Sequence, residues 1–237
     1  MKNKRSGCRP AAVVLLSGGL DSAVTLYYAM RKGFSCTCLS FDYGQRHRRE
    51  MQSAARIARY ARCKHYVIQV RFPWKGSSLL DASARLPERR AGARTGAAAI
   101  PNTYVPGRNI IFLSFAVSCA EAINARAVFI GANAVDYSGY PDCRPAFYKA
   151  FRNAVSRGTR CGVEQHPVKI ATPLIDMTKA GIVELGTRLK VPFGLTWSCY
   201  RGGQAPCGKC DSCFYRRKGF QEAGMIDPLE RGRKAFR

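Results

Sequence analysis

Acidic side chains are scarce in this sequence of 237 residues, which has 15 Asp and Glu against 39 Lys and Arg and a formal net charge of +24. Such an imbalance attracts phosphates, nucleotides and nucleic acids. The arginine-rich stretches at residues 46–49, 85–94 and 231–237 lack the interleaved aromatic side chains on which bases stack. We interpret them as solvated surface and do not expect nucleic acid as a partner.

Long apolar runs are also missing. No run approaches the roughly 18 residues needed to cross a bilayer, and the first ten residues, MKNKRSGCRP, lack the apolar stretch of a signal peptide. We therefore expect a cytoplasmic location and no contact with membranes. In that reducing compartment the 11 cysteines should be buried or bind metal rather than form disulfides.

The apolar pattern alternates between strand and helix. The predicted strands span residues 12–16, 34–41, 66–70 and 127–131. The predicted helices span residues 20–30, 46–62, 109–125, 144–156 and 178–190, the last with Thr178 as its cap. This order is typical of an α/β fold with a parallel sheet. In residues 72–107 the apolar residues recur at neither helix nor strand spacing, and this segment is predicted to form a long loop or lid.

The turn SGGLDS joins the first predicted strand to the first predicted helix at residues 17–22. Unpaired backbone N–H groups and the positive end of a helix dipole bind anions at such a junction. Gly18 and Gly19 allow close approach to the backbone, and Ser17 and Ser22 add hydroxyl donors. The turn has neither the lysine of a Walker A loop nor the GxGxxG spacing, which disfavours a kinase-type P-loop and a dinucleotide-binding loop. Two glycines alone are equally compatible with an ordinary turn.

Four cysteines gather near the C-terminal end with the spacing C-x7-C-x2-C-x2-C. They are Cys199, Cys207, Cys210 and Cys213. Four thiolates can close a tetrahedron around Zn²⁺, and a site without an open position would be structural. An iron–sulfur cluster and a site without metal are the alternatives. The other seven cysteines do not cluster and are predicted to be buried as small apolar side chains.

The segment GANAVDYSGYPDCR follows the fourth predicted strand at residues 131–144, where open α/β sheets bind ligands. There a carboxylate can accept two hydrogen bonds from a guanine-like ring, an aromatic side chain can stack on it, and an arginine can bind an acid group. The alternative is a structural loop in which an aspartate caps the next helix.

The string VVLL followed by SGGLDS resembles the SGGxDS signature of the PP-loop ATP pyrophosphatases. In that superfamily the loop holds the leaving pyrophosphate of ATP, and the acidic residue, here Asp21, helps with Mg²⁺. The residues that this resemblance predicts to contact ATP are Leu16, Ser17, Gly18, Gly19, Leu20, Asp21, Ser22, Ala23, Val24, Thr25 and Leu26.

Four strings together resemble the QueC family of 7-cyano-7-deazaguanine synthases: SGGLDS, VPGRNIIFLS at residues 105–114, GANAVDYSGYPDCR and CYRGGQAPCGKCDSC at residues 199–213. The resemblance runs from Val13 to about Gly219. It implies a Rossmann-like parallel sheet of the PP-loop (adenine nucleotide alpha hydrolase-like) type in residues 1–195. A small zinc-bound segment, residues 196–237, would pack on it as part of one compact unit, commonly in a homodimer.

The resemblance further implies conversion of 7-carboxy-7-deazaguanine and ammonia to the nitrile, 7-cyano-7-deazaguanine, in queuosine or archaeosine biosynthesis. ATP is the co-substrate and would activate first the acid and then the amide by adenylation, with release of AMP. The predicted catalytic residues are Ser17, Asp21, Ser22, Arg108 and Lys179. The predicted substrate-binding residues are Asp136, Tyr137, Tyr140, Asp142 and Arg144.

Three alternatives stay open. Lys179 begins a predicted helix and would be an exposed first-turn lysine in a purely structural interpretation. An enzyme with the same loop could act on a tRNA base through the basic surface. A nucleotide-binding regulator or nucleic-acid-binding module held together by zinc would need no catalytic groups.

Overall fold

Five parallel strands form one sheet with the order β3–β2–β1–β4–β5. The structure is a computed structural model that describes residues 9–81, 83–87, 100–135 and 139–230. The strands are β1 (Ala11–Leu15), β2 (Ser35–Asp42), β3 (Lys64–Gln69), β4 (Ala127–Phe129) and β5 (Lys169–Ala171). The predicted α/β class and parallel sheet are confirmed.

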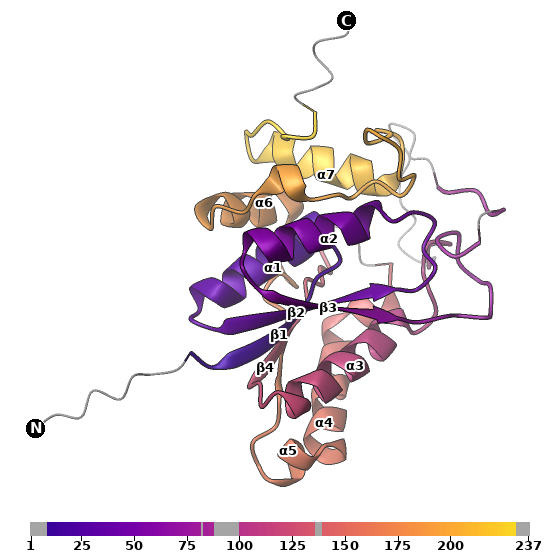
Figure 1. The fold of residues 1–237 in the computed structure, drawn as a ribbon. Helices are drawn as coiled ribbons and strands as arrows, with labels where there is room; N and C mark the ends of the chain where they lie inside the picture. Colours follow the sequence, from indigo (N-terminus) through magenta and orange to yellow (C-terminus); the bar gives the residue numbers. More distant parts are fainter. Residues whose placement is uncertain (1–8, 82, 88–99, 136–138, 231–237) are drawn as a thin grey trace, which may run out of the picture.

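Helices cover both faces of this sheet. They are α1 (Leu20–Arg31), α2 (Arg49–Tyr60), α3 (Arg108–Ala122), α4 (Pro145–Gly158), α5 (Arg160–Val163), α6 (Lys179–Arg188) and α7 (Asp211–Glu222), with 3-10 turns η1 (Pro141–Cys143) and η2 (Phe193–Leu195). Helices α1, α2, α6 and α7 lie on one side of the sheet, and α3 and α4 lie on the other (Figure 1). Among the described residues, no helix is long and apolar enough to span a bilayer.

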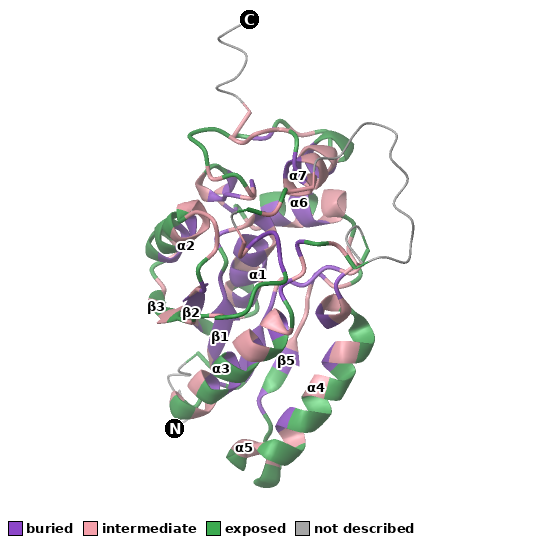
Figure 2. Cartoon of the chain, turned by 90° about the vertical axis from the view of Figure 1, so that its right-hand side faces the viewer, coloured by how far each residue is buried: buried purple, intermediate pink, exposed green. Residues whose placement is uncertain are grey.

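The central strand β1 is apolar throughout because it is buried on both faces. Successive side chains of a strand point to opposite faces, so Ala12 and Val14 join the core beneath α1 and α6. Val13 joins the second core, which contains Leu113 of α3 and Tyr148 of α4. Both cores meet at the buried strands in the middle of the molecule (Figure 2).

The predicted strands and helices are all present, with ends shifted by a few residues. Thr178 caps α6 as predicted, because its hydroxyl accepts a hydrogen bond from the Gly181 N–H at 3.1 Å. Neither helix nor strand forms in the described parts of residues 72–107, as predicted. Strand β5 and helix α7 were not predicted. β5 has only three residues, and α7 is polar apart from a few side chains such as Phe220, which packs at 5.3 Å on the Phe193 ring.

A buried ion pair fixes α7 to the chain on either side of it. The Arg216 guanidinium donates to both carboxylate oxygens of Asp227 at 2.6 and 2.9 Å and to the Thr196 hydroxyl at 2.7 Å. The two charged side chains are 5% and 4% exposed. Such a pair is stable only while each charge keeps its partner, because an unpaired buried charge is strongly unfavourable.

We expect Asp227→Ala to lower the free energy of unfolding by about 3–5 kcal/mol, because it leaves the Arg216 charge buried without its carboxylate. The matched control is Glu230→Ala. It removes a partner of Arg217 at 3.1 Å, but those side chains are 38% and 39% exposed, so the cost should be about 0–1 kcal/mol. Urea unfolding of both variants measures the difference, and equal losses would contradict the buried-pair interpretation.

Candidate functional site

A cavity of about 340 Å³ lies at the carboxyl-terminal edge of the sheet. The chain leaves β1 toward β2 on one side, and β4 lies on the other side of β1, so the cavity sits at the switch point where open α/β sheets bind ligands. The first turns of α1, α2, α3 and α6 line it. Each contributes the positive end of a helix dipole, so the cavity favours anions.

The SGGLDS turn forms one wall of this cavity. The Ser17 hydroxyl donates to the Ser22 hydroxyl at 3.1 Å, and the Ser22 hydroxyl donates to the Gly19 carbonyl at 3.0 Å. The first helical N–H groups of α1 have no carbonyl four residues before them with which to pair inside the helix. These N–H groups could therefore bind an anion at the turn.

The residues predicted to contact ATP fall into two groups. Those that line the cavity are Leu16, Ser17, Gly19, Leu20, Asp21 and Ser22. The remainder, Gly18, Ala23, Val24, Thr25 and Leu26, do not line it, and the last four of these are buried inside α1. Of the residues predicted to contact ATP, those in the turn and the first helical turn are therefore the ones that a ligand in this cavity could touch.

Gly18 holds the turn against α2. Its φ is +89°, and a Cβ there would lie 2.1 Å from the Glu50 carbonyl oxygen and 2.7 Å from the Ala54 nitrogen. Its own carbonyl accepts a hydrogen bond from the Trp197 N–H at 2.9 Å. Only glycine satisfies both the backbone angle and this close approach.

Lys179 and Asp21 face each other across the cavity wall. The Lys179 ammonium donates to both Asp21 carboxylate oxygens at 2.9 and 2.8 Å, and the lysine side chain is only 12% exposed. The alternative of an exposed first-turn lysine is therefore wrong. The pair joins the N-terminus of α6 to that of α1.

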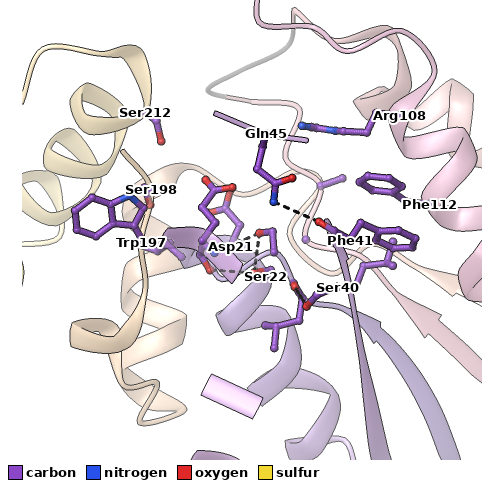
Figure 3. A pocket seen from close by; sticks show the side chains of 18 of the residues that line it. Asp21, Ser22, Ser40, Phe41, Gln45, Arg108, Phe112, Trp197, Ser198 and Ser212 are labelled. Atoms are coloured by element: carbon purple, nitrogen blue, oxygen red, sulfur yellow. Dashed lines mark hydrogen bonds between the residues drawn. The ribbon is translucent and has the colours of Figure 1, made fainter. Parts of the chain in front are cut away.

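Arg108 begins α3 on the opposite side of the cavity. Its guanidinium donates to the Tyr43 hydroxyl at 3.3 Å. Beyond it the rings of Phe41 and Phe112 stack at 3.9 Å. Figure 3 shows Arg108 and Phe112 on one side, Trp197 and Ser198 on the other, and Asp21 and Ser22 between them.

Glu50, in the first turn of α2, also lines the cavity. Burial raises its pKa to about 7, the Arg108 charge opposes that shift, and Cys199 adds to it. Neither Glu50 nor the segment at residues 43–47 was predicted to lie at the site, although that segment follows the predicted strand next to β1. In a parallel sheet such a segment must reach the same edge, and this was the signal that could have found it.

Of the predicted substrate-binding residues that the structure describes, some line the cavity and others do not. Asp136 and Tyr137 lie outside the described residues. Tyr140 is buried and lines the cavity, and its hydroxyl lies 2.6 Å from the Thr103 hydroxyl. Arg144 is exposed and does not line this cavity, so the geometry lends its assignment no support.

Asp142 is buried, and burial raises its pKa. One of its carboxylate oxygens accepts a hydrogen bond from the Asn109 N–H at 3.0 Å, and its carbonyl accepts another from the Asn109 side chain at 3.2 Å. It thus caps the N-terminus of α3, a helix that precedes it in the sequence, instead of the helix that follows it. Its predicted contact with a substrate stays a prediction.

The four clustered cysteines come together as their spacing predicts. Their sulfur atoms all lie within 4.8 Å of one another, and Cys207 and Cys213 are 3.9 Å apart. Backbone N–H groups donate to the Cys199 and Cys207 sulfurs at 3.3–3.4 Å. Four thiolates this close would repel one another without a cation, so the cluster could hold a metal ion.

This cluster also supports one wall of the cavity. The Trp197 indole N–H donates to the Cys199 carbonyl at 2.9 Å, and the Trp197 backbone N–H donates to Gly18. Trp197 and Ser198 line the cavity. The consecutive residues Trp197, Ser198 and Cys199 therefore link the cysteine cluster to the SGGLDS turn.

The remaining cysteines only partly follow the prediction of burial. Cys36 and Cys38 are buried in the same core, beneath α1 and α2. The other described ones are partly exposed, and Cys143 among them lines the cavity. Cys8 lies outside the described residues.

Comparison with known proteins identifies the relatives of this chain. The family model described as "Queuosine biosynthesis protein QueC" matches residues 11–224. Proteins named 7-cyano-7-deazaguanine synthase are 52% identical over 92% of this chain in Acetivibrio thermocellus and 50% identical over 92% in Thermoplasma volcanium. The matches cover 96% and 90% of those two proteins. A third, from Nostoc punctiforme, is 51% identical over 92% of this chain and 98% of its own length.

We expect Gly18→Ala to destabilise the protein more than Gly33→Ala, measured by urea unfolding. Both glycines have φ near +89°, but a Cβ at Gly33 meets nothing within 4 Å. The left-handed backbone should cost each variant about 1–2 kcal/mol. The collision with the α2 backbone should add about 1–3 kcal/mol for Gly18 alone. Equal losses would show that the contact between the turn and α2 is not tight.

Proposed function

The chain belongs to the QueC family of queuosine biosynthesis proteins, and from this premise we propose that it is an AMP-forming ligase that uses ATP. Its substrates are 7-carboxy-7-deazaguanine and ammonia, and its product is 7-cyano-7-deazaguanine. The observation that carries this proposal is the SGGLDS turn at the N-terminus of α1, in a cavity that the first turns of α2, α3, α6 and α7 also line. Such a cavity suits a triphosphate.

The chemical difficulty is the loss of both carboxylate oxygens, neither of which is a good leaving group. The acid attacks the α-phosphorus of ATP, and pyrophosphate leaves. Ammonia then forms a bond to the acyl carbon, and the bond to AMP breaks, which yields the amide. A second ATP activates the amide oxygen in the same way, and loss of AMP and protons from that intermediate yields the nitrile.

Each residue at the turn has a part in this scheme. The hydroxyls of Ser17 and Ser22 and the nearby backbone N–H groups bind the departing pyrophosphate. Asp21 is the acidic side chain that would hold Mg²⁺, which neutralises phosphate charge when bound. Arg108 and Lys179 add fixed positive charge at the opposite walls, where charge develops during each adenylation.

The deazapurine lies near the end of β4 in this proposal. Tyr140 supplies an aromatic wall, supported by its place in the cavity beside Thr103. We keep Asp136 and Tyr137 as contacts to the ring, and Asp142 and Arg144 as weaker candidates, because Asp142 caps α3 and Arg144 is exposed. Substitution of each residue, with the KM for the acid as the readout, separates these roles.

We divide the chain into an ATP-binding part, residues 1–195, and a C-terminal segment, residues 196–237, that packs on it as part of one compact unit. Support comes from the close crossing of α6 and α7, where a Cβ at Gly219 would lie 2.5 Å from the Lys179 Cγ. Limited proteolysis tests this division, because a segment that is part of the same unit should not be released as a folded fragment.

The metal at the four cysteines is Zn²⁺ in this proposal. Sulfurs in a tetrahedron with zinc–sulfur bonds of about 2.3 Å lie about 3.8 Å apart, close to the 3.9 Å between Cys207 and Cys213. Cys199, Cys207, Cys210 and Cys213 would fill all four positions, so the ion would stabilise the fold and take no part in the reaction.

We expect about one zinc per chain by elemental analysis, lost in Cys210→Ser, with a lower melting temperature as the main consequence. Cys161→Ser is the control, because Cys161 lies outside the cluster and should leave the zinc content unchanged. Iron with visible absorbance would refute the zinc assignment.

A homodimer is also part of this proposal. Helix α3 is apolar on its outer side as well as its inner side, with Ile110 and Phe115 exposed by 47% and 43%, and an apolar face of this kind is typical of subunit contacts. Sedimentation equilibrium of Phe115→Lys and of the unchanged protein tests it, because the charged variant should have the mass of a monomer.

The reaction itself is tested with 7-carboxy-7-deazaguanine, ammonium, Mg²⁺ and ATP. We expect two AMP for each nitrile, because the scheme adenylates the acid and then the amide. Release of ADP, or no nitrile from a folded and metal-loaded sample, would refute the scheme. A modified base after incubation with tRNA instead would favour the alternative of a tRNA-modifying enzyme.

A further inference from the structure

We propose that Glu50 is a catalytic residue of this site: its carboxylate binds the ammonium ion and takes the proton that must leave before nitrogen can attack the activated acid. This inference rests on the proposed function and adds to it the group that handles the nitrogen substrate. The SGGLDS turn and the side chains of Arg108 and Lys179 activate the acid, and Asp21, the carboxylate of that turn, is held by Lys179 through both oxygens.

The position of Glu50 is fixed relative to the SGGLDS turn. Glu50 lies in the first turn of α2 and lines the cavity. The backbone of Gly18 packs against the backbone of Glu50 so closely that a Cβ would lie 2.1 Å from the Glu50 carbonyl oxygen. The carboxylate is thus attached to the wall where the acyl adenylate would form.

The Arg108 charge acts on the Glu50 carboxylate without forming an ion pair with it. Asp21, the other carboxylate on the wall, is bound by Lys179 through both oxygens. No described residue donates a hydrogen bond or an ion pair to the Glu50 carboxylate. A carboxylate without a partner repels phosphates and is costly to bury, so a ligand that brings a proton or a positive charge is the partner that it fits.

Ammonium fits better than a second Mg²⁺. The Arg108 charge acts on Glu50, and the other titratable side chains that line the cavity within the described residues include Asp21, Arg46, His47 and Lys179. Burial raises the pKa of Glu50 to about 7, so the group can gain and lose a proton at neutral pH, as a proton acceptor in catalysis must. A divalent cation would instead need a carboxylate that stays ionised, and at the same distance Arg108 would repel its two charges about twice as strongly as the single charge of ammonium.

Ammonium gives one proton to the Glu50 carboxylate, and the lone pair released on nitrogen forms the bond to the acyl carbon. The carbon–oxygen bond to AMP breaks, AMP leaves with that electron pair, and the nitrogen loses a second proton to water. After Glu50 has returned its proton to solvent, it can accept a proton again when the activated amide loses its two N–H protons to become the nitrile.

The experiment compares wild type with Glu50→Gln, and Glu184→Gln, an exposed residue on α6, is the matched control. Near pH 7 we expect kcat/KM for ammonium to fall about 10²-fold or more in Glu50→Gln. Acid-dependent exchange of pyrophosphate into ATP, which reports the first adenylation, should stay within about threefold of wild type. Glu184→Gln should match wild type in both assays.

Hydroxylamine provides the second readout, because it is already neutral near pH 7 and needs no proton acceptor before it attacks. Glu50→Gln should therefore form the hydroxamate at close to the wild-type rate, and its reaction with ammonium should recover as the pH rises and more free ammonia is present. A general structural defect would lower both reactions equally. Glu50→Asp, which keeps the carboxylate, should fall between wild type and Glu50→Gln.

Three results would overturn the proposal. Unchanged kinetics with ammonium in Glu50→Gln would show that the carboxylate is not needed. Loss of pyrophosphate exchange would assign Glu50 to adenylation or to Mg²⁺. Equal loss with hydroxylamine and ammonium would leave Glu50 a structural role only. Absence of exchange and nitrile in wild type would instead refute the proposed function itself, so the two failures are distinguishable.

Discussion

Because all five strands are parallel, each strand ends at the same edge of the sheet and the helices that follow begin there. This constraint assembles the cavity from segments far apart in the sequence: the SGGLDS turn after β1, residues 43–47 after β2 and the GANAV segment after β4. It also points the N-termini of α1, α2, α3 and α6 at one volume. The preference for anions is therefore a property of the topology before any basic side chain is considered.

The C-terminal segment completes the cavity by a different kind of interaction. Helix α7 has few apolar side chains, so packing alone would hold it weakly. The Arg216–Asp227 pair and the four cysteines provide specific links instead. Since Trp197 lies between these links and its backbone N–H donates to the Gly18 carbonyl, order in the C-terminal segment is coupled to the geometry of the SGGLDS turn.

The sequence predicted those parts of the molecule whose residues lie close together in the chain. The strand–turn–helix around SGGLDS and the cysteine cluster could be predicted because each is formed by residues close together in the chain. Asp142 could not be placed in this way, because the helix that it caps begins 34 residues before it in the chain. Glu50 was missed for a similar reason, since the start of α2 contacts Gly18, which lies 32 residues before Glu50 in the chain.

The large positive net charge of the chain does not predict the balance of charges inside this cavity. On α2 the arginines Arg56 and Arg59 are exposed on the outer face, while Glu50 of the same helix lines the cavity. Within the cavity wall, Lys179 is balanced by Asp21, and Arg216 is balanced by Asp227. Among these groups Arg108 and Glu50 are left facing each other without an ion pair within the part of the chain that the structure describes. A cavity with such local balance can bind an anion and still offer one carboxylate to a proton, which a uniformly basic cavity could not do.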